Sequence, residues 1–180
     1  MQRQRISSIK FWLLLRGLSN ENPPYAPQRR SGGRQAVCKK LAGYKGLLPQ
    51  DYLDGLGEWR WDSKFTGLPG SFVITHGDII VGHSCARAAA DEAMSGWGEV
   101  WTLYVLPEYW GKGFGKALLQ NSVDWLREQC YERVYLWALE ANTRARRFYE
   151  KQGFRENGDT MRCEIGGTIV TDIRYIKDIV

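Results

Sequence analysis

The stretch of sequence that decides the fold is residues 99–116, EVWTLYVLPEYWGKGFGK. β-Branched and aromatic side chains dominate residues 99–105, which predicts a strand that Pro107 ends. Beyond the glycines, apolar residues at 119, 123, 126 and 130 follow the spacing of a helix over residues 113–130. The glycine-rich segment therefore joins a strand to an amphipathic helix.

Three glycines at alternate positions in Gly111–Lys116 allow a tight turn that presents backbone N–H groups outward. The helix that follows adds the positive end of its dipole, and together they suit a phosphate or diphosphate. A Walker A loop fails at Trp110 and Ala117, and a dinucleotide-binding fingerprint fails at Lys116 or at Leu118. A plain glycine-rich turn remains the alternative for this segment taken alone.

Working outward, hydrophobic patterning predicts further strands and a second helix. Residues 71–75 and 79–82 form a predicted hairpin, residues 133–139 and 168–176 are strands, and Asn142 caps a helix that Gly153 closes. From residue 71 onward the order is β-β-β-α-β-α-β-β. This order predicts an α/β (α+β) domain, a mixed sheet with helices on its faces.

The length of 180 residues fits one domain, and the charge is unevenly distributed along it. Residues 1–45 hold 10 basic and 1 acidic residues, a net of +9, and residues 46–180 hold 15 and 19, a net of −4. We therefore expect an atypical basic N-terminal arm over residues 1–41 and one domain over residues 42–180. The basic isoelectric point is not a nucleic-acid signature of the whole protein, and we expect no nucleic-acid partner.

The cysteines and the apolar runs indicate the cellular compartment. The 4 cysteines are scattered with no CxxC pair, and there are 2 histidines, so we expect free thiols in a reducing cytoplasm and no metal site. Residues 11–15 form the apolar run nearest the N-terminus, which is too short for a secretion signal, and no run approaches the roughly 20 residues of a membrane span. We expect no membrane association.

Two segments carry a family resemblance. Trp110–Gly115 resembles the Q/R-x-x-G-x-G/A signature of the GNAT family of N-acetyltransferases, and Asn142–Phe154 resembles the family's N-x-x-A-x-x-F-Y-x-K-x-G-F segment. They stand in the family's order, and the resemblance is strongest over residues 96–154. Trp110 departs from the usual Gln or Arg, and residues 1–41 lack the family's first strand and the start of its first helix.

The resemblance implies a fold and an activity. The fold is the acyl-CoA N-acyltransferase fold, a mixed, mostly antiparallel sheet splayed at its central strand, with helices on both faces. The activity is direct transfer of the acetyl group of acetyl-CoA to a primary amine of a small molecule or peptide in a ternary complex. No cysteine is placed to carry an acyl group. Dimers are common in the family, but no residue here fixes the oligomeric state, so a homodimer stays open.

The resemblance also implies site residues. Glu99 is the general base, through a water, and Tyr149 returns a proton to the thiolate; the alternatives are a surface glutamate and a core aromatic. Asn142 binds the pantetheine arm, or caps its helix, or does both. The cofactor-binding residues are the backbone of Leu103, Tyr104 and Val105 together with Trp110, Gly111, Lys112, Gly113, Phe114, Gly115 and Lys116, although the two lysines read equally well as solvated.

The acceptor side is less defined by the sequence. The resemblance assigns it to the first helices and loops, where aromatic and acidic residues would suit a cationic amine, or would simply be core: Tyr44, Asp51, Tyr52, Trp59, Trp61 and Trp97. Arg144, Arg146 and Arg147 are expected to form a solvated helix face, and the alternative is contact with the adenosine phosphates of the cofactor. Two other functions stay open: a non-catalytic acyl-CoA sensor with the same fold, and a binder of anionic partners through the basic arm.

Overall fold

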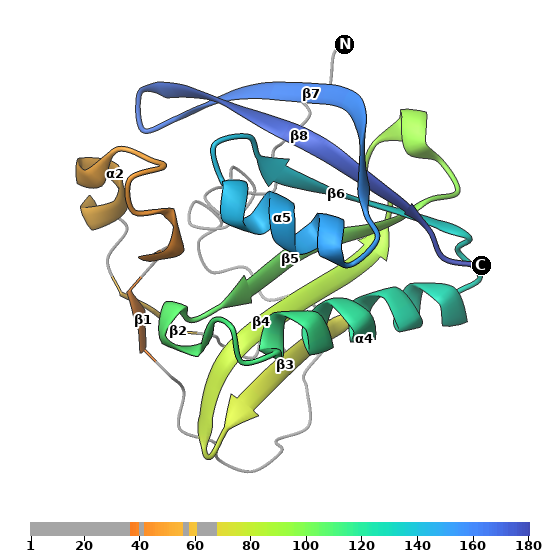
Figure 1. Cartoon of the computed structure of the whole chain (residues 1–180), viewed down its shortest axis with the longest axis horizontal. Coiled ribbons are helices and arrows are strands. Elements are labelled where there is room, and N and C mark those ends of the chain that lie inside the picture. The colour runs from red at the N-terminus through yellow and green to blue at the C-terminus, as the bar shows by residue number, and fades with distance from the viewer. Residues whose placement is uncertain (1–36, 40–41, 56–57, 61–67) are drawn as a thin grey trace, which may run out of the picture.

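The computed structural model describes residues 37–39, 42–55, 58–60 and 68–180 (Figure 1). Most of the predicted arm, residues 1–41, lies outside these ranges, and its assignment as a basic arm stays a prediction. The exception is Val37–Lys39, strand β1, which pairs antiparallel with β2, Glu58–Arg60.

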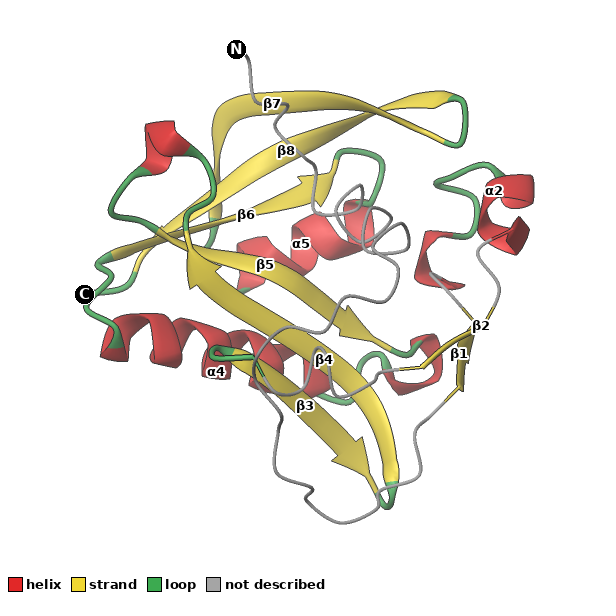
Figure 2. Ribbon diagram, turned by 180° about the vertical axis from the view of Figure 1, so that it is seen from behind, coloured by secondary structure: helices red, strands yellow, loops and turns green. Residues whose placement is uncertain are grey.

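Six further strands form one mixed sheet in the order β3-β4-β5-β6-β8-β7 (Figure 2). Neighbouring strands are antiparallel except β5 and β6, which run parallel. The predicted hairpin and the mixed, mostly antiparallel sheet are therefore confirmed. The strands are β3 Ser71–His76, β4 Ile79–Ala88, β5 Gly98–Val105, β6 Arg133–Leu139, β7 Arg155–Ile165 and β8 Thr168–Asp178.

The two long helices follow β5 and β6 along the chain. α4, Phe114–Glu128, ends two residues before the predicted end, because Cys130 adopts a left-handed φ of 65° and the Tyr131 N–H turns back to the Leu126 carbonyl at 3.1 Å. α5 is Thr143–Lys151, and the shorter helices are α2 Gln50–Gly55 and the 3-10 turns Ala42–Tyr44, Glu92–Met94 and Pro107–Tyr109. Within the described ranges, none of the helices has the length and apolar character needed to cross a membrane.

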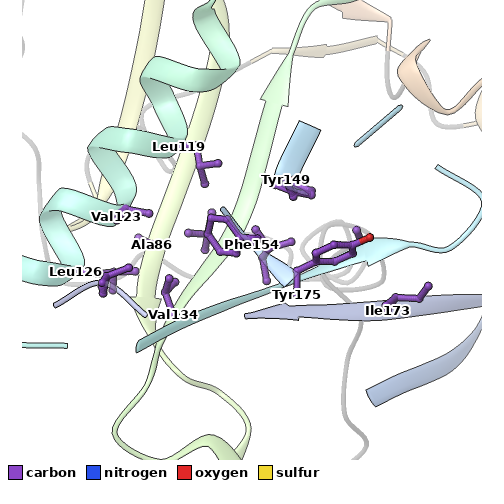
Figure 3. Close-up of a cluster of buried hydrophobic side chains, with 13 residues drawn as sticks. Ala86, Leu119, Val123, Leu126, Val134, Tyr149, Phe154, Ile173 and Tyr175 are labelled. Atoms are coloured by element: carbon purple, nitrogen blue, oxygen red, sulfur yellow. The ribbon is translucent and has the colours of Figure 1, made fainter. Parts of the chain in front are cut away.

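The main core lies between the sheet and one layer formed by α4 and α5 (Figure 3). Leu119, Val123 and Leu126 from α4 and Tyr149 from α5 meet inward side chains of the sheet such as Ile173. These α4 residues recur at the helical spacing that the sequence showed, so one stripe of the helix is buried.

A second, smaller cluster lies on the opposite face of the sheet. Leu53 of α2 and Leu48, just before this helix, belong to the cluster. They pack with the strand residues Leu139, Ile165 and Val170. Leu139 follows Ala138 of the main core, and successive residues of a strand point to opposite faces. Helices therefore cover both faces of the sheet, as expected.

The sheet parts between β5 and β6. Only Gly98–Val134 and Glu99–Tyr135 are in register, and beyond them the two strands diverge, with α5 seen between their ends in Figure 1. On its other edge β5 stays paired with β4 through Val105, around a bulge at Trp101. The splayed central strand that the resemblance implied is present.

We expect Gly98→Ala to destabilise the protein by about 1–3 kcal/mol, because the new Cβ would lie 2.7 Å from Leu126 Cδ2 where β5 begins to pair with β6. In a Leu126→Ala background the same change should cost at least about 1 kcal/mol less, since the opposing methyls are gone. Free energies of unfolding of the four proteins in denaturant measure this coupling. Strictly additive costs would contradict it.

Candidate functional site

A cavity of about 300 Å³ opens where β5 and β6 part. Four segments form its wall: the end of β5, the glycine turn before α4, one side of α5 with its two capping residues, and the 3-10 turn at Tyr44. The lining residues are Gly43, Tyr44, Leu103, Tyr104, Val105, Tyr109, Trp110, Gly111, Gly113, Gly115, Lys116, Asn142, Arg144, Ala145, Phe148, Tyr149 and Gln152.

Most of the predicted site residues meet at this cavity. The end of β5, most of the glycine turn with Lys116, and Asn142 with Tyr149 from α5 all contribute to its wall. Lys112, Phe114 and Glu99 do not line it. Segments far apart in the sequence therefore face one space, although each role assigned to them stays a prediction.

The glycine turn has the geometry of an anion site. Gly111 and Gly113 have φ values of 74° and 84°, which side chains with a Cβ adopt only under strain. Gly113 precedes α4 and no side chain caps the helix, so the N–H groups of its first turn lack an acceptor within the helix. These N–H groups lie at the positive end of the dipole of a 15-residue helix, so both favour an anion at the start of α4.

The two predicted residues of this turn outside the lining support its shape. Lys112 Nζ lies 4.7 Å from the centroid of the Tyr109 ring, and the Phe114 ring is tilted by 33° against the same ring with the two centroids 6.0 Å apart. Tyr109 itself lines the cavity, and the sequence analysis did not select it. An aromatic residue in a turn gave no signal of which way its ring would face.

The end of β5 supplies backbone groups. Beyond Glu99 this strand has no register partner in β6, so the edge of residues 103–105 that faces β6 borders the opening. The Val105 carbonyl accepts a hydrogen bond from Trp110 Nε1 at 2.8 Å. The backbone of Leu103, Tyr104 and Val105 therefore lies where the predicted role requires it, at the edge of the cavity.

Asn142 has both of the positions considered for it. Its side-chain oxygen accepts a hydrogen bond from the Ala145 N–H at 3.1 Å, which caps α5, and the residue is buried in the cavity wall. The capping role is confirmed. Its side-chain NH₂ group is the part suited to a ligand carbonyl.

Tyr149 is a buried residue of the cavity wall, with its ring centroid 5.2 Å from that of Phe148 and 6.1 Å from that of Phe154. Burial raises the pKa of the Tyr149 phenol well above its ordinary value, Tyr44 adds to this, and Arg144 opposes it. The phenol therefore keeps its proton throughout the neutral range. Tyr149 therefore belongs both to the core and to the cavity wall, the two positions that the sequence left as alternatives.

Glu99 lies at the point where the sheet parts. It is 4% exposed, and its Oε2 accepts a hydrogen bond from Arg87 Nε at 2.8 Å in an ion pair. Burial first, and then the Glu99 charge, raise the pKa of the Tyr135 phenol well above its ordinary value. The alternative that Glu99 is a surface glutamate is wrong, because the residue is buried. Its role as the general base stays a prediction, and any such base is ion-paired with Arg87.

The acceptor candidates are dispersed. Tyr44 lines the cavity, and burial, reinforced by Asp172, raises its pKa to about 12. Tyr52 packs in the smaller core cluster, and Trp97 lies under Arg133, whose guanidinium carbon is 4.4 Å from the ring centroid. Asp51 is exposed on α2. The Trp59 side chain and Trp61 lie outside what the structure describes.

Arg144, for which a solvated helix face was the main expectation and contact with the adenosine phosphates the alternative, is part of the site. It lines the cavity, and its guanidinium carbon lies 3.3 Å from the centroid of the Trp110 ring. Its i, i+4 spacing to Phe148 was the available signal. Among the described residues, no group of three His, Cys, Asp or Glu side chains is arranged to hold a metal ion.

Comparison with known proteins identifies the same family that the two sequence segments resemble. The model of the Acetyltransferase (GNAT) family matches residues 39–154. An uncharacterized N-acetyltransferase of Archaeoglobus fulgidus is 38% identical over 71 residues, 39% of this chain and 44% of the relative. A [ribosomal protein bS18]-alanine N-acetyltransferase of Haemophilus influenzae is 36% identical over 77 residues, 43% of this chain and 49% of the relative. The chain thus spans about half the length of these relatives.

Solved structures share the fold. The ribosomal-protein-alanine N-acetyltransferase of Brucella melitensis superposes with a TM-score of 0.54 at 21% identity, over 60% of this chain and 67% of that one. The structure of yncA from Salmonella typhimurium with its cofactor acetyl-CoA gives 0.54 at 18% identity, over 61% and 64%. At such identities the likeness concerns the fold.

Proposed function

The chain belongs to the GNAT acetyltransferase family, and on that premise we propose that it transfers the acetyl group of acetyl-CoA directly to a primary amine. The observation that carries the proposal is the cavity at the parting of β5 and β6. The glycine turn bounds one side of it and the Tyr149 phenol lies in its wall. An anion site and a proton donor around one opening suit a donor that carries phosphates and releases a thiolate.

The site residues match the steps of such a transfer. A neutral amine attacks the thioester carbonyl carbon, an N–C bond forms, and the C–S bond breaks to release the thiolate. We assign the oxyanion to backbone N–H groups at the end of β5, which have no partner in β6. Tyr149 gives its proton to the thiolate, and Glu99 takes the proton that the amine loses, through a water.

The protonation of Tyr149 supports its role as the acid. Because burial keeps the phenol neutral, the proton is available at every pH where an amine is nucleophilic. The ordinary pKa values of a thiol and of a tyrosine are about 8.5 and 10, so the transfer has no large mismatch in free solution. The raised pKa makes Tyr149 a weaker acid than a free tyrosine, so its proton passes to the sulfur only as negative charge develops there and the C–S bond breaks.

For the acceptor we propose a small-molecule amine or a peptide N-terminus. One relative is named for the alanine of a ribosomal protein, and another, of Beutenbergia cavernae, is a mycothiol acetyltransferase 42% identical over 57 residues, 32% of this chain and 19% of the relative. Tyr44, beside the opening, offers an aromatic face to a cation. We propose a cytoplasmic location, consistent with free thiols at Cys85 and Cys130.

Acetyl-CoA at about 100 times its Kd should stabilise the protein by about 2.7 kcal/mol and raise its Tm by roughly 5–10 °C. A panel of amines, followed by detection of the released thiol, then identifies turnover. Stabilisation without thiol release from any amine would favour the acyl-CoA sensor instead. If acetyl-CoA leaves the Tm unchanged, both readings of the cavity are wrong.

Tyr149→Phe should lower kcat by about 100-fold, because the thiolate loses its proton donor, while the Kd for acetyl-CoA changes less than about twofold. Steady-state kinetics and calorimetry measure the two quantities. Tyr175→Phe is the matched control: Tyr175 is also buried, and its hydroxyl bonds Glu150 and Glu156 rather than lining the cavity. Equal losses in both variants would assign Tyr149 a packing role only.

Glu99→Gln should lower kcat/KM by at least about 100-fold and remove the acidic limb of its pH profile, if the carboxylate is the base. Arg87→Gln breaks the same ion pair but keeps the carboxylate, so it should retain most of the activity. Both variants are checked for unfolding free energy. Similar activity losses from the two changes would make the ion pair, and not the base, the reason for Glu99.

A further inference from the structure

The cavity wall contains a positively charged side chain, Arg144, that is not part of the sequence signature. Among the described lining residues the charged ones are Lys116, in α4, and Arg144, near the start of α5, and there is no carboxylate. The lining therefore has a positive charge that no acidic neighbour within it offsets. Such a lining favours an anionic ligand.

Arg144 differs from Arg146, its neighbour on α5. Arg146 pairs with Glu156 at 2.6 Å and donates to the Tyr175 hydroxyl at 3.1 Å. In the described part of the chain, Arg144 makes no ion pair with a carboxylate. Its partner is the Trp110 ring.

The stacking on Trp110 fixes how Arg144 is presented. The 3.3 Å distance places the guanidinium carbon over the ring face. The guanidinium keeps five N–H donors for other acceptors, because a ring face takes up its charge without an acceptor atom. A planar donor set of this kind suits a phosphate in a bidentate geometry. Arg144 is exposed to solvent at this position, where a ligand can reach it.

Trp110 is itself held in place on two sides. Its Nε1 donates to the Val105 carbonyl at 2.8 Å, and its Cζ2 lies so close to Gly43 that a Cβ there would be 2.9 Å away. The indole therefore has little freedom to turn, and the guanidinium above it is preorganised. Trp110 also directly precedes the glycine turn, so Arg144 lies beside the anion site formed by Gly111 and Gly113.

We propose that Arg144, positioned over the Trp110 ring, binds a phosphate group of coenzyme A. In this arrangement α5 supplies the cation, and the residue at position 110 provides the surface that orients it. The inference rests on the proposed function, because it concerns the donor of the same site. The phosphate is either the diphosphate or the 3′-phosphate, and truncated forms of the coenzyme distinguish them.

The test compares Arg144→Met with Arg133→Met. Arg133 stacks on Trp97 in the same way, at 4.4 Å, beside the opposite end of β5 and outside the cavity lining. Both variants lose an arginine over an indole, and only the first should affect the ligand. Kd values for coenzyme A, 3′-dephospho-coenzyme A and pantetheine are measured by calorimetry, with competition for the weak ligands.

Arg144→Met should raise the Kd of coenzyme A at least about tenfold and leave that of pantetheine within about twofold, because a charge-assisted hydrogen bond is lost. If the loss persists with 3′-dephospho-coenzyme A, the contact is the diphosphate, and if it disappears, the contact is the 3′-phosphate. For Arg144→Lys, the Kd of coenzyme A should lie between the wild-type value and that of Arg144→Met, since lysine keeps the charge without the planar donors. Arg133→Met should leave all three values unchanged, and circular dichroism checks that each variant is folded.

Two results would overturn the inference alone: equal weakening of all three ligands, or unchanged Kd values with only a higher KM for the amine, which would assign Arg144 to the acceptor. A wild-type protein that binds none of the three would overturn the proposed function, and the inference with it.

Discussion

The parting of the parallel pair β5 and β6 is the constraint on which the rest of the structure depends. Two residue pairs hold these strands together, at Gly98 and Glu99, and no β6 residue pairs with the remainder of β5. A strand edge that loses its partner in the interior must satisfy its backbone groups in another way. Here the edge borders a cavity, so the sheet gives up hydrogen bonds where a ligand can replace them.

The region around the two remaining pairs is closely packed, and this keeps the opening in place. Leu126 of α4 lies so close to Gly98 that a Cβ at this position would be 2.7 Å from the Leu126 Cδ2, so any larger residue would displace the leucine side chain. Glu99 of β5 forms an ion pair with Arg87 of β4, in which the carboxylate is buried and the Arg87 side chain is 32% exposed, and the Arg87 guanidinium carbon also lies 4.3 Å from the centroid of the Trp101 ring. Breaking one partner of such a pair leaves a charge in a poorly solvated place, which disfavours rearrangement. The strands therefore separate from a fixed point.

The wall of the opening combines rigid and accessible parts. Trp110 connects the end of β5 to the start of the glycine turn through its bond to Val105. Arg144 on its outer face stays exposed, while Tyr149, at the other side of α5, is buried. A solvent-facing cation suits a phosphate that remains hydrated, and a buried phenol suits a step from which water is excluded. One short helix thus supports two different environments.

Local sequence determined the elements and much of the site. The alternation and composition of residues 99–105, the apolar spacing of α4 and the glycines at 111 and 113 are properties of neighbouring residues, and they predicted the strand, the helix and the turn between them. The capping of α5 by Asn142 was predictable for the same reason. The tertiary structure alone brings particular side chains together: Glu99 meets Arg87, the Arg144 guanidinium lies over the Trp110 ring while staying exposed, and Tyr44 joins the cavity from a segment well before β5 in the sequence. The first contact depends on the register of β4 against β5, in which Arg87 and Glu99 are opposite each other. The other two depend on how α5 and the 3-10 turn at Tyr44 line the opening between β5 and β6. Hydrophobic periodicity along one segment carries no information about how such segments are arranged in space.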